Sequence, residues 1–292
     1  MDERSALRLL AADLPDAGDD AAVVDGLVVT TDMLHESTDF PAGTTRYTAG
    51  WRAVAASLSD VAAMGADATA AVAAYGAPSL DETELLEFVG GARDVCESVD
   101  AAYVGGDLDT HGEFTVATTA LGETDAPLRR SGASPGETIC VTGALGRSAA
   151  ALRAFEAGDD ERGNDLFRFD PRVGAGVGLR PHATAMMDSS DGLARSLHQL
   201  AEASDCGFEI EWDRLPVHDA VTEYATDGDD ERAMAATFGE DFELVFTLPA
   251  DAVDAAKNTV SVPLTAIGEV TDDGVVADGD PLPDEGYTHA DD

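Results

Sequence analysis

Two periods of hydrophobic residues run along this chain, and together they predict a protein built from both strands and helices. The apolar run LVVTT at residues 27–31 is typical of a buried strand, which we expect to end at Asp32. Residues 50–64 carry apolar side chains at steps of three and four, the spacing of one face of a helix. Because strand and helix signals alternate along the chain, we expect an α/β or α+β fold.

The first half of the sequence contains further signals of regular structure. The capping-box signature SLDE at residues 79–82 predicts a helix that runs to about Val99. Strands are expected at residues 69–75, 102–104 and 114–121. Residues 123–136 are rich in turn formers, so we expect two domains, 1–126 and 127–292.

The second half of the sequence continues the alternation. Strands are expected at residues 138–141, 185–187, 207–212, 242–248 and 264–267, and helices from about Leu145 and over 192–203. The side chains expected to point inward from segment 207–212 are Phe208, Ile210 and Trp212. The acidic segments 158–165 and 227–231 are expected to be surface loops, and the glycine-rich segment 173–179 a packing or turn segment.

The charge of the chain limits its possible partners. It has 58 Asp and Glu residues against 17 Lys and Arg residues, a formal net charge of −41. A field of that sign repels phosphate backbones, so we expect no nucleic-acid partner and no anionic-membrane partner. Lys257 is the only lysine, which argues against a Walker-type phosphate loop. Such a composition predicts a halophilic protein, because concentrated salt screens its self-repulsion to about 3 Å.

The cysteines and histidines exclude two common kinds of site. Cys96, Cys140 and Cys206 are odd in number and widely spaced, so neither a disulfide framework nor a zinc site is expected. The six histidines form no H-E-x-x-H or H-x-H cluster. The sequence is charged from residue 2 and has no apolar run near the ~18 residues of a membrane span. We therefore expect a protein of the reducing cytoplasm, without a signal peptide.

Four carboxylates stand out because they follow a predicted strand or lie among apolar residues. These are Asp32, Asp60, Asp107 and Asp188. A carboxylate in such a place is costly unless it is paired or binds a cation. Because basic residues are few, a divalent metal is the natural partner, and oxygen donors select Mg²⁺.

Further oxygen donors lie beside these four in the sequence. They are Asp19, Asp20, Thr30, Thr31 and Asp191, although Asp19 and Asp20 alone could form an ordinary turn. Several clustered Mg²⁺ ions need bridging phosphates, which indicates a nucleoside triphosphate. Such a site can transfer a phosphoryl group without a lysine, because the metals neutralise its charge.

Glycines and arginines add weaker candidates. Gly105 and Gly106 would let the backbone approach a phosphate closely. The segment GALGRS at residues 143–148 could open a helix onto an anion. Arg130 could clamp a phosphate or form a structural salt bridge, and the sequence leaves both possibilities open.

Seven short motifs occur along residues 18–246 in a specific order. They are GDDAAVV (18–24), TTDML (30–34), SLSDVAAMGAD (57–67), GGD (105–107), RSGASPGETICVTGALGRSAAAL (130–152), MMDSSDGL (186–193) and GEDFELVF (239–246). In these motifs the chain resembles the thiamine-monophosphate kinases. That family shares a superfamily with aminoimidazole ribonucleotide synthetase, selenophosphate synthetase and a hydrogenase-maturation protein.

The resemblance implies a fold, a reaction and a set of site residues. The N-terminal α/β domain would pair with its copy in a homodimer to close a β-barrel, beside a C-terminal α/β sandwich. The γ-phosphoryl group of ATP would pass to thiamine monophosphate, giving thiamine diphosphate and ADP. Positions that match metal ligands of the family are Asp20, Thr30, Thr31, Asp32, Asp60, Asp107, Asp188 and Asp191. Positions that match nucleotide contacts are Gly106, Asp107, Arg130 and Ser190, and Glu240 matches a thiamine contact.

No catalytic side chain is expected, because the acceptor phosphate oxygen is already anionic and needs no strong base. Three positions depart from the family pattern. Asp39 stands where the family usually has His, and its charge could meet cationic thiamine. The segment LDTHG replaces the usual T-x-x-G after GGD. The aromatic residue that covers thiamine has Tyr287 as its nearest candidate.

Two other readings stay open. The first is another ATP-dependent enzyme of the superfamily, of the cyclo-ligase type. Selenophosphate synthesis is disfavoured because no Cys precedes Cys96 and no Lys precedes Lys257, and the hydrogenase-maturation type because the chain ends HADD. The second is a non-catalytic acidic cation-binding protein, whose carboxylates would be scattered over loops.

Overall fold

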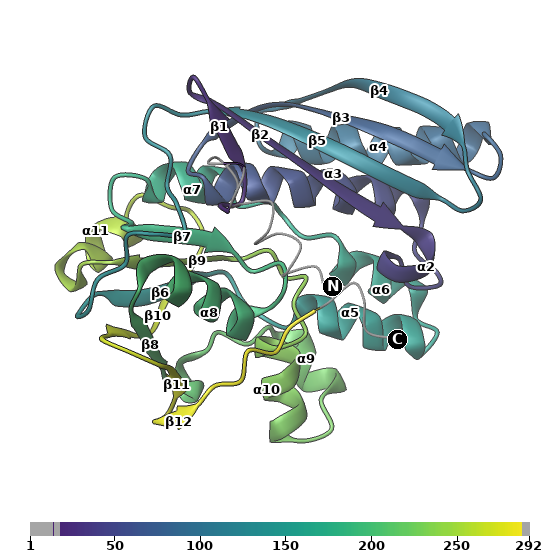
Figure 1. The fold of residues 1–292 in the computed structure, drawn as a ribbon. Helices are drawn as coiled ribbons and strands as arrows, with labels where there is room; N and C mark the ends of the chain where they lie inside the picture. Colours follow the sequence, from purple (N-terminus) through teal and green to yellow (C-terminus); the bar gives the residue numbers. More distant parts are fainter. Residues whose placement is uncertain (1–13, 15–17, 288–292) are drawn as a thin grey trace.

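The computed structural model describes residue 14 and residues 18–287, which Figure 1 shows as two α/β units stacked on each other. The upper unit in that view is a five-stranded sheet with two long helices along one side. The lower unit is a seven-stranded sheet with shorter helices around it. The mixed α/β fold with two domains is therefore confirmed. No helix in the described part of the chain is both long and apolar enough to cross a membrane.

The first sheet has the strand order β1-β2-β5-β3-β4, with β3 and β4 parallel and the other neighbours antiparallel. Its strands are β1 (Ala22–Val24), β2 (Leu27–His35), β3 (Asp67–Ala77), β4 (Ala102–Thr110) and β5 (Thr115–Glu123). The helices of this unit are the short α2 (Glu36–Asp39) and the long α3 (Arg46–Ala63) and α4 (Glu82–Ser98). The sheet is half-buried because α3 and α4 cover one of its faces.

The opposite face of the first sheet is open. No described helix covers it, and alternate residues of β2 point toward it, including Thr31 and Met33. Met33 is 58% exposed. A depression on this face is lined in part by Met33, Ala74, Asp107 and Ala117. Within residues 18–287, a single copy thus leaves one face of this sheet uncovered, with apolar side chains such as Met33 on it.

The second sheet has the strand order β12-β11-β8-β10-β6-β9-β7. Its strands are β6 (Thr138–Thr142), β7 (Ala185–Asp188), β8 (Gly207–Ile210), β9 (Leu244–Leu248), β10 (Leu264–Thr271), β11 (Val275–Ala277) and β12 (Asp280–Pro281). Its helices are α5 (Arg147–Glu156), α6 (Asp160–Phe167), α7 (Val173–Leu179), α8 (Leu193–Ser204), α9 (Asp219–Tyr224), α10 (Gly228–Ala236) and α11 (Val253–Lys257). The strands β6 and β9 are buried along their length, as expected for the middle of a layered domain.

Helix α3 joins the two units, because it packs on the first sheet and also on α7 and β7 of the second domain. The two backbones approach closely at Gly176, where an added Cβ would lie 2.1 Å from the Ala62 carbonyl oxygen. The Trp51 indole nitrogen also donates a hydrogen bond of 2.6 Å to the Phe169 carbonyl oxygen across the junction. The domain interface is therefore packed and specific.

The predicted elements of the first half are confirmed in kind, but two strands run further than expected. β2 continues past Asp32 to His35, because its pairing with β5 continues as far as Thr115. β4 extends to Thr110 instead of stopping at residue 104, and it pairs with β3 over that length. Asp107 therefore lies inside a strand, where the sequence placed it after one.

Two acidic segments that were expected to be loops are helical. Most of segment 158–165 belongs to α6, and segment 227–231 begins α10. The side chains of Asp159 and Asp227 cap these helices, and the acids that follow interact favourably with the helix dipole. Acidic residues favour helix N-termini as well as loops, so composition alone gave the wrong prediction.

Three smaller predictions are refined. The glycine-rich segment 173–179 is a packing segment, one of the two expected forms, and it is helical, as α7. Trp212 packs half-buried against the core of the second domain, as expected, but from a 3₁₀ turn (Trp212–Arg214) and not from a strand, because β8 ends at Ile210. Phe242 lies just before β9 and has a φ of +54°, a conformation that cannot continue a strand.

Candidate functional site

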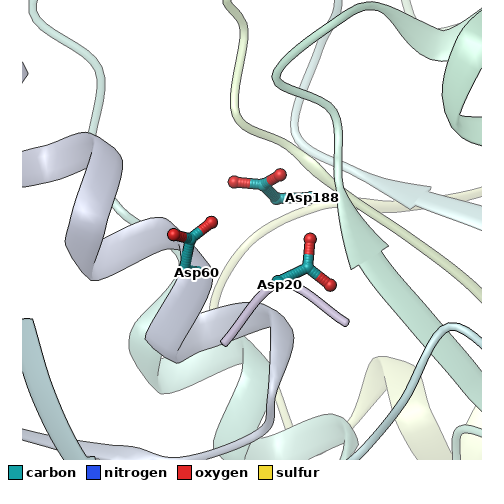
Figure 2. Close-up of side chains that lie close together, drawn as sticks. All are labelled: Asp20, Asp60 and Asp188. Atoms are coloured by element: carbon teal, nitrogen blue, oxygen red, sulfur yellow. The ribbon is translucent and has the colours of Figure 1, made fainter. Parts of the chain in front are cut away.

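Three carboxylates from distant parts of the sequence meet at the junction between the two domains. Asp20 lies in the turn before β1, Asp60 on α3, and Asp188 at the end of β7. One carboxylate oxygen from each lies within 4.8 Å of one from each of the others. Figure 2 shows the three side chains directed toward a common space. We call these three residues the acid cluster.

The negative charge of the acid cluster is only partly balanced by the protein, because one arginine, Arg130, pairs with it. Burial, followed by the charges of Asp32 and Asp188, raises the pKa of Asp60 well above its ordinary value. Burial and the charge of Asp20 raise the pKa of Asp188 to about 8. The Oδ2 atom of Asp188 is buried and has no hydrogen-bond partner among the described residues. Several carboxylate oxygens converge here, and the protein does not fully balance their negative charge. This arrangement fits a hard divalent metal such as Mg²⁺.

Two further predicted ligands lie beside the acid cluster. The Thr30 hydroxyl donates a hydrogen bond to the Asp60 carboxylate. Asp32 lies on the same face of β2 and accepts a 2.5 Å hydrogen bond from the Ser57 hydroxyl of α3. Burial raises the pKa of Asp32, and the hydrogen bond from Ser57 partly offsets that rise. β2 and α3 therefore hold four oxygen-bearing side chains at their contact.

Arg130 forms an ion pair with the acid cluster through Asp20. The Arg130 Nη2 atom lies 2.9 Å from an oxygen of Asp20, whose side chain is almost fully buried. The neighbouring Arg129 pairs with Asp19 at 2.5 Å, and the Arg130 backbone N–H donates to the same carboxylate. The segment between the domains is thus attached to the turn that carries Asp20. Of the two possibilities that the sequence left open for Arg130, this structure contains the salt bridge.

Two predicted ligands lie away from the acid cluster in a single chain. Thr31 points to the open face of the first sheet, and its hydroxyl donates to the Thr118 carbonyl oxygen at 2.8 Å. Asp107 is exposed and pairs with Ala74 on the same open face. The sequence grouped Asp107 with Asp60 because both seemed hard to solvate, but an edge strand leaves Asp107 in water.

Gly106 has a structural reason to be glycine. An added Cβ would lie 1.7 Å from the Ala73 carbonyl oxygen of the neighbouring strand. The neighbouring strand β3 thus lies against Gly106 on the side where a phosphate was expected. Gly105 has nothing within 4 Å of the same position, so it is the less crowded of the pair.

The candidate substrate residues Asp39, Glu240 and Tyr287 lie near one another. Burial, followed by the charges of Asp39 and Glu240, raises the pKa of Tyr287 to about 12. The Tyr287 hydroxyl donates to the Thr38 carbonyl oxygen at 3.4 Å, and its backbone N–H donates to the Asp191 carbonyl oxygen at 3.1 Å. Asp39 itself accepts the His35 backbone N–H at 2.7 Å. The end of the described chain thus reaches back to α2.

Ser190 and Glu240 lie against each other through their backbones. The Glu240 N–H donates to the Ser190 carbonyl oxygen at 2.5 Å. Asp241 follows and accepts hydrogen bonds from the Gly146 and Ser148 backbone N–H groups at the start of α5. The motif around Glu240 is therefore held from both sides.

Sequence reasoning missed three buried polar groups near this site: Ser57, Asp241 and Arg52. The signal for Arg52 was present, because it interrupts the apolar side of a predicted helix in a chain poor in cations. The other two gave no signal, because serines and aspartates are common in this sequence.

Comparison with known proteins places the chain in a family. Residues 18–124 match the family described as AIR synthase related protein, N-terminal domain, and residues 134–279 match its C-terminal domain. The chain is 62% identical over 291 residues to the thiamine-monophosphate kinase of Halobacterium salinarum, covering 99% of this chain and 100% of that protein. It is 40% identical over 301 residues to the thiamine-monophosphate kinase of Methanospirillum hungatei, covering 99% of each.

Its fold also matches a solved structure of AaThiL complexed with AMPPCP and TMP. The TM-score is 0.89 at 28% identity, and the match covers 99% of this chain and 97% of that one. The chain therefore belongs to the AIR synthase related family and, within it, to the thiamine-monophosphate kinases.

Proposed function

We propose that this protein transfers the γ-phosphoryl group of ATP to thiamine monophosphate, releasing thiamine diphosphate and ADP. The observation that carries the proposal is the acid cluster, where one buried and two partly buried carboxylates from three distant parts of the chain come together. The names of the relatives and the ligands of the AaThiL structure support the same reaction.

The residues of the acid cluster would hold magnesium, with Asp32 and Thr30 beside them. The remaining metal ligands of our proposal are Thr31, Asp107 and Asp191. Several bound Mg²⁺ ions would neutralise charge on the transferring phosphoryl group. The chain's own residues would bind and align the reactants for in-line transfer, with Gly106, Asp107, Arg130 and Ser190 on the nucleotide. Asp39, Glu240 and Tyr287 would contact the thiamine moiety, and the negative charges of Asp39 and Glu240 suit its cationic ring.

The chain needs no catalytic base for this reaction. The acceptor is a phosphate oxygen that carries negative charge near neutral pH, so positioning provides most of the rate. Asp188 is buried and Asp20 and Asp60 are partly buried, which would limit the access of water to a group bound there. We place the reaction in the cytoplasm, and the three cysteines, none in a disulfide, suit a reducing compartment.

ADP release tests the proposed function. In about 2 M KCl with Mg²⁺ and ATP, we expect ADP to form only when thiamine monophosphate is present, together with an equal amount of thiamine diphosphate. ADP formation without thiamine monophosphate would favour another ATP-dependent enzyme of the superfamily. No ADP under any condition, with magnesium still bound, would favour a non-catalytic cation-binding protein.

We further propose that a second copy covers the open face of the first sheet and that the two sheets close a β-barrel. Exposed Met33 and the uncovered alternate residues of β2 support this arrangement. We set the domain boundary between residues 126 and 127, in the segment that precedes Arg129 and Arg130. Met33→Glu is expected to convert a dimer to a monomer by light scattering, whereas Leu86→Glu on exposed α4 leaves the dimer intact. A wild-type monomer would refute the homodimer.

The position of Asp107 makes a sharper test possible. If the Asp107 side chain serves a site in the second copy, Asp107→Asn and Asp60→Asn enzymes will complement each other. After the two are unfolded and refolded together, half of the dimers are mixed and each has one intact site, which restores about a quarter of the wild-type activity. No recovery, with mixed dimers present, would show that Asp107 serves its own chain or no site.

A further inference from the structure

We propose that Arg52 is a positioning residue, which holds Glu240 in place across the domain interface so that Glu240 can contact the substrate. The inference rests on the proposed function, because it gives Glu240 a substrate to contact. It concerns a residue that takes no part in the site as described above.

Arg52 is a charged residue in a place that usually excludes charge. It lies on α3 in the first domain, it is 1% exposed, and it is among the largest fully buried side chains of the protein. Burying a guanidinium group is costly unless its charge and its N–H groups are satisfied. In a chain with only 17 basic residues, such a use of an arginine calls for an explanation.

The partners of Arg52 all lie in the second domain. Its Nη2 atom is 2.6 Å from the Glu240 carboxylate and 3.0 Å from the Glu240 carbonyl oxygen. Its Nη1 atom donates to the Phe167 carbonyl oxygen at 2.7 Å. The guanidinium carbon lies 3.7 Å from the centre of the Phe167 ring, in a cation–π contact. Arg52 thus binds both the backbone and the side chain of Glu240.

Glu240 has a backbone conformation that needs such support. Its φ is +64°, in the left-handed region that residues other than glycine, asparagine and aspartate rarely adopt. Its carbonyl oxygen accepts hydrogen bonds from both Arg52 and the Ser148 hydroxyl, the latter at 2.6 Å. One carboxylate oxygen, Oε2, faces Arg52, and the side chain is 23% exposed. Among the described residues only Oε2 has a hydrogen-bond partner, so the other oxygen, Oε1, could contact a ligand.

The contact connects Arg52 to the candidate site. Gly239 packs so tightly on segment 190–192 that an added Cβ would lie 2.7 Å from the Ser190 carbonyl oxygen. The charge of Glu240 acts on both Asp32 and Tyr287, raising the pKa of each. Glu240 therefore lies close enough to the Asp32 and Tyr287 side chains for its charge to act on both. A shift of Glu240 would change the substrate side of the site while leaving Asp20, Asp60 and Asp188 in place.

Steady-state kinetics test the proposal. We expect Arg52→Gln to raise the KM for thiamine monophosphate about tenfold or more, because a charged hydrogen bond that orients Glu240 is lost. The KM for ATP is expected to rise much less than the KM for thiamine monophosphate, since Arg52 contacts none of the proposed nucleotide residues and reaches Ser190 only through the Glu240 backbone. Arg52→Lys keeps the charge and is expected to recover part of the loss, and it also serves if Arg52→Gln does not fold.

Arg180→Gln provides the matched control. Arg180 also crosses the domain interface, where it donates to the Gly65 carbonyl oxygen and the Thr124 hydroxyl at 3.1 Å each. It contacts no proposed site residue, so its loss should lower thermal stability and leave both KM values unchanged. If Arg52→Gln changes stability alone, as the control does, Arg52 is merely structural and the proposal is overturned.

Hydrogen exchange gives a readout that does not need activity. The Glu240 and Phe242 amides donate to the Ser190 and Ser189 carbonyl oxygens. Arg52→Gln, but not Arg180→Gln, is expected to speed exchange at these two amides at least tenfold. Unchanged exchange would overturn the proposal even if the wild type proved inactive. If exchange is faster in Arg52→Gln but the wild type is inactive, the proposed reaction is rejected. The conclusion that Arg52 fixes the position of Glu240 would still stand.

Discussion

The residues of the acid cluster show what a buried carboxylate requires in a chain with few cations. Asp20 has Arg130 at 2.9 Å, so its charge is matched by protein alone. Asp60 has a hydroxyl donor in Thr30, and Asp188 has an oxygen with no partner among the described residues. A single arginine cannot neutralise three carboxylates, so the arrangement favours either protonation or a bound cation.

Asp60→Asn tests whether the acid cluster binds Mg²⁺. The wild-type melting temperature is expected to rise on adding Mg²⁺, because a ligand that binds only the folded state stabilises it. The variant lacks one charge, so its melting temperature without metal should be higher and the rise with Mg²⁺ largely lost. The measurement is thermal unfolding in about 2 M KCl with EDTA or with Mg²⁺. Asp272→Asn, on an exposed turn, is the control, and an equal rise in Asp60→Asn would rule out the site.

Asp241 is expected to make stability depend on pH. Burial raises the pKa of Asp241 to about 7, although the Ser148 and Gly146 N–H groups oppose that rise. An acid with a raised folded pKa binds more protons when folded, so its contribution to the free energy of unfolding falls as pH rises from about 4 to about 7. Asp241→Asn should flatten that part of the curve, whereas Asp272→Asn should not. Urea unfolding at several pH values measures this, and parallel curves for wild type and Asp241→Asn would contradict it.

A buried polar residue can be predicted from the sequence when the residues on either side of it in the chain are apolar. Asp60 and Asp188 lie among apolar residues in the sequence, and at the junction Asp188 is buried and Asp60 partly buried. Asp107 gave a similar signal but lies on the edge strand β4, and no local pattern says which strand forms an edge. Arg52 and Asp241 depend on partners about a hundred or more residues away, so their roles appear only in the fold.

At the scale of elements, α3 and α4 pack unusually closely because each presents a glycine to the other. An added Cβ at Gly50 would lie 2.1 Å from the Phe88 carbonyl oxygen, and one at Gly91 would lie 2.0 Å from the Tyr47 carbonyl oxygen. Since α3 carries Asp60 and Arg52, its distance from α4 affects where both side chains lie. The packing of two helices behind the sheet thus supports the site.

Gly91→Ala is expected to separate the two helices. Its methyl group would overlap the α3 backbone, which cannot give way as a flexible side chain could, so we expect a loss of about 1–3 kcal/mol. Gly90→Ala is the matched control, because its Cβ would lie 3.6 Å from the Tyr47 ring, an ordinary contact. That change should stabilise the helix by about 0.5–1 kcal/mol. Urea unfolding in high KCl compares the two, and equal effects would show that the close approach is unimportant.

The elements with strong periodicity could be predicted, and those governed by capping could not. α3 could be predicted from apolar residues at steps of three and four, and β6 from a short apolar run. α6 and α10 begin in acidic segments whose helical form depends on Asp159 and Asp227 as caps. The extent of β4 depends on its pairing with β3, and that is a tertiary contact.

The net charge of the whole molecule is strongly negative, and most of the acidic side chains remain exposed on its surface. With a formal net charge of −41, most acids lie on the surface and repel one another, which favours expansion of the chain. The core is rich in alanine, especially along α3, so each residue contributes little buried apolar area. Stability must therefore depend on the solvent more than it does in an ordinary protein. Composition predicted this property directly, and the Halobacterium salinarum relative agrees with it.

The dependence on salt can be measured directly. We expect the melting temperature to rise steadily from about 0.1 M to about 2 M KCl, because the distance over which charges act falls from about 10 Å to below 3 Å. Sucrose at the same osmolality is excluded from protein surfaces but screens no charge, so it should stabilise the protein much less. The rise should also flatten at acidic pH, where protonation removes part of the repulsion. Full stability in about 50 mM KCl would show instead that the surface acids are already balanced within the fold.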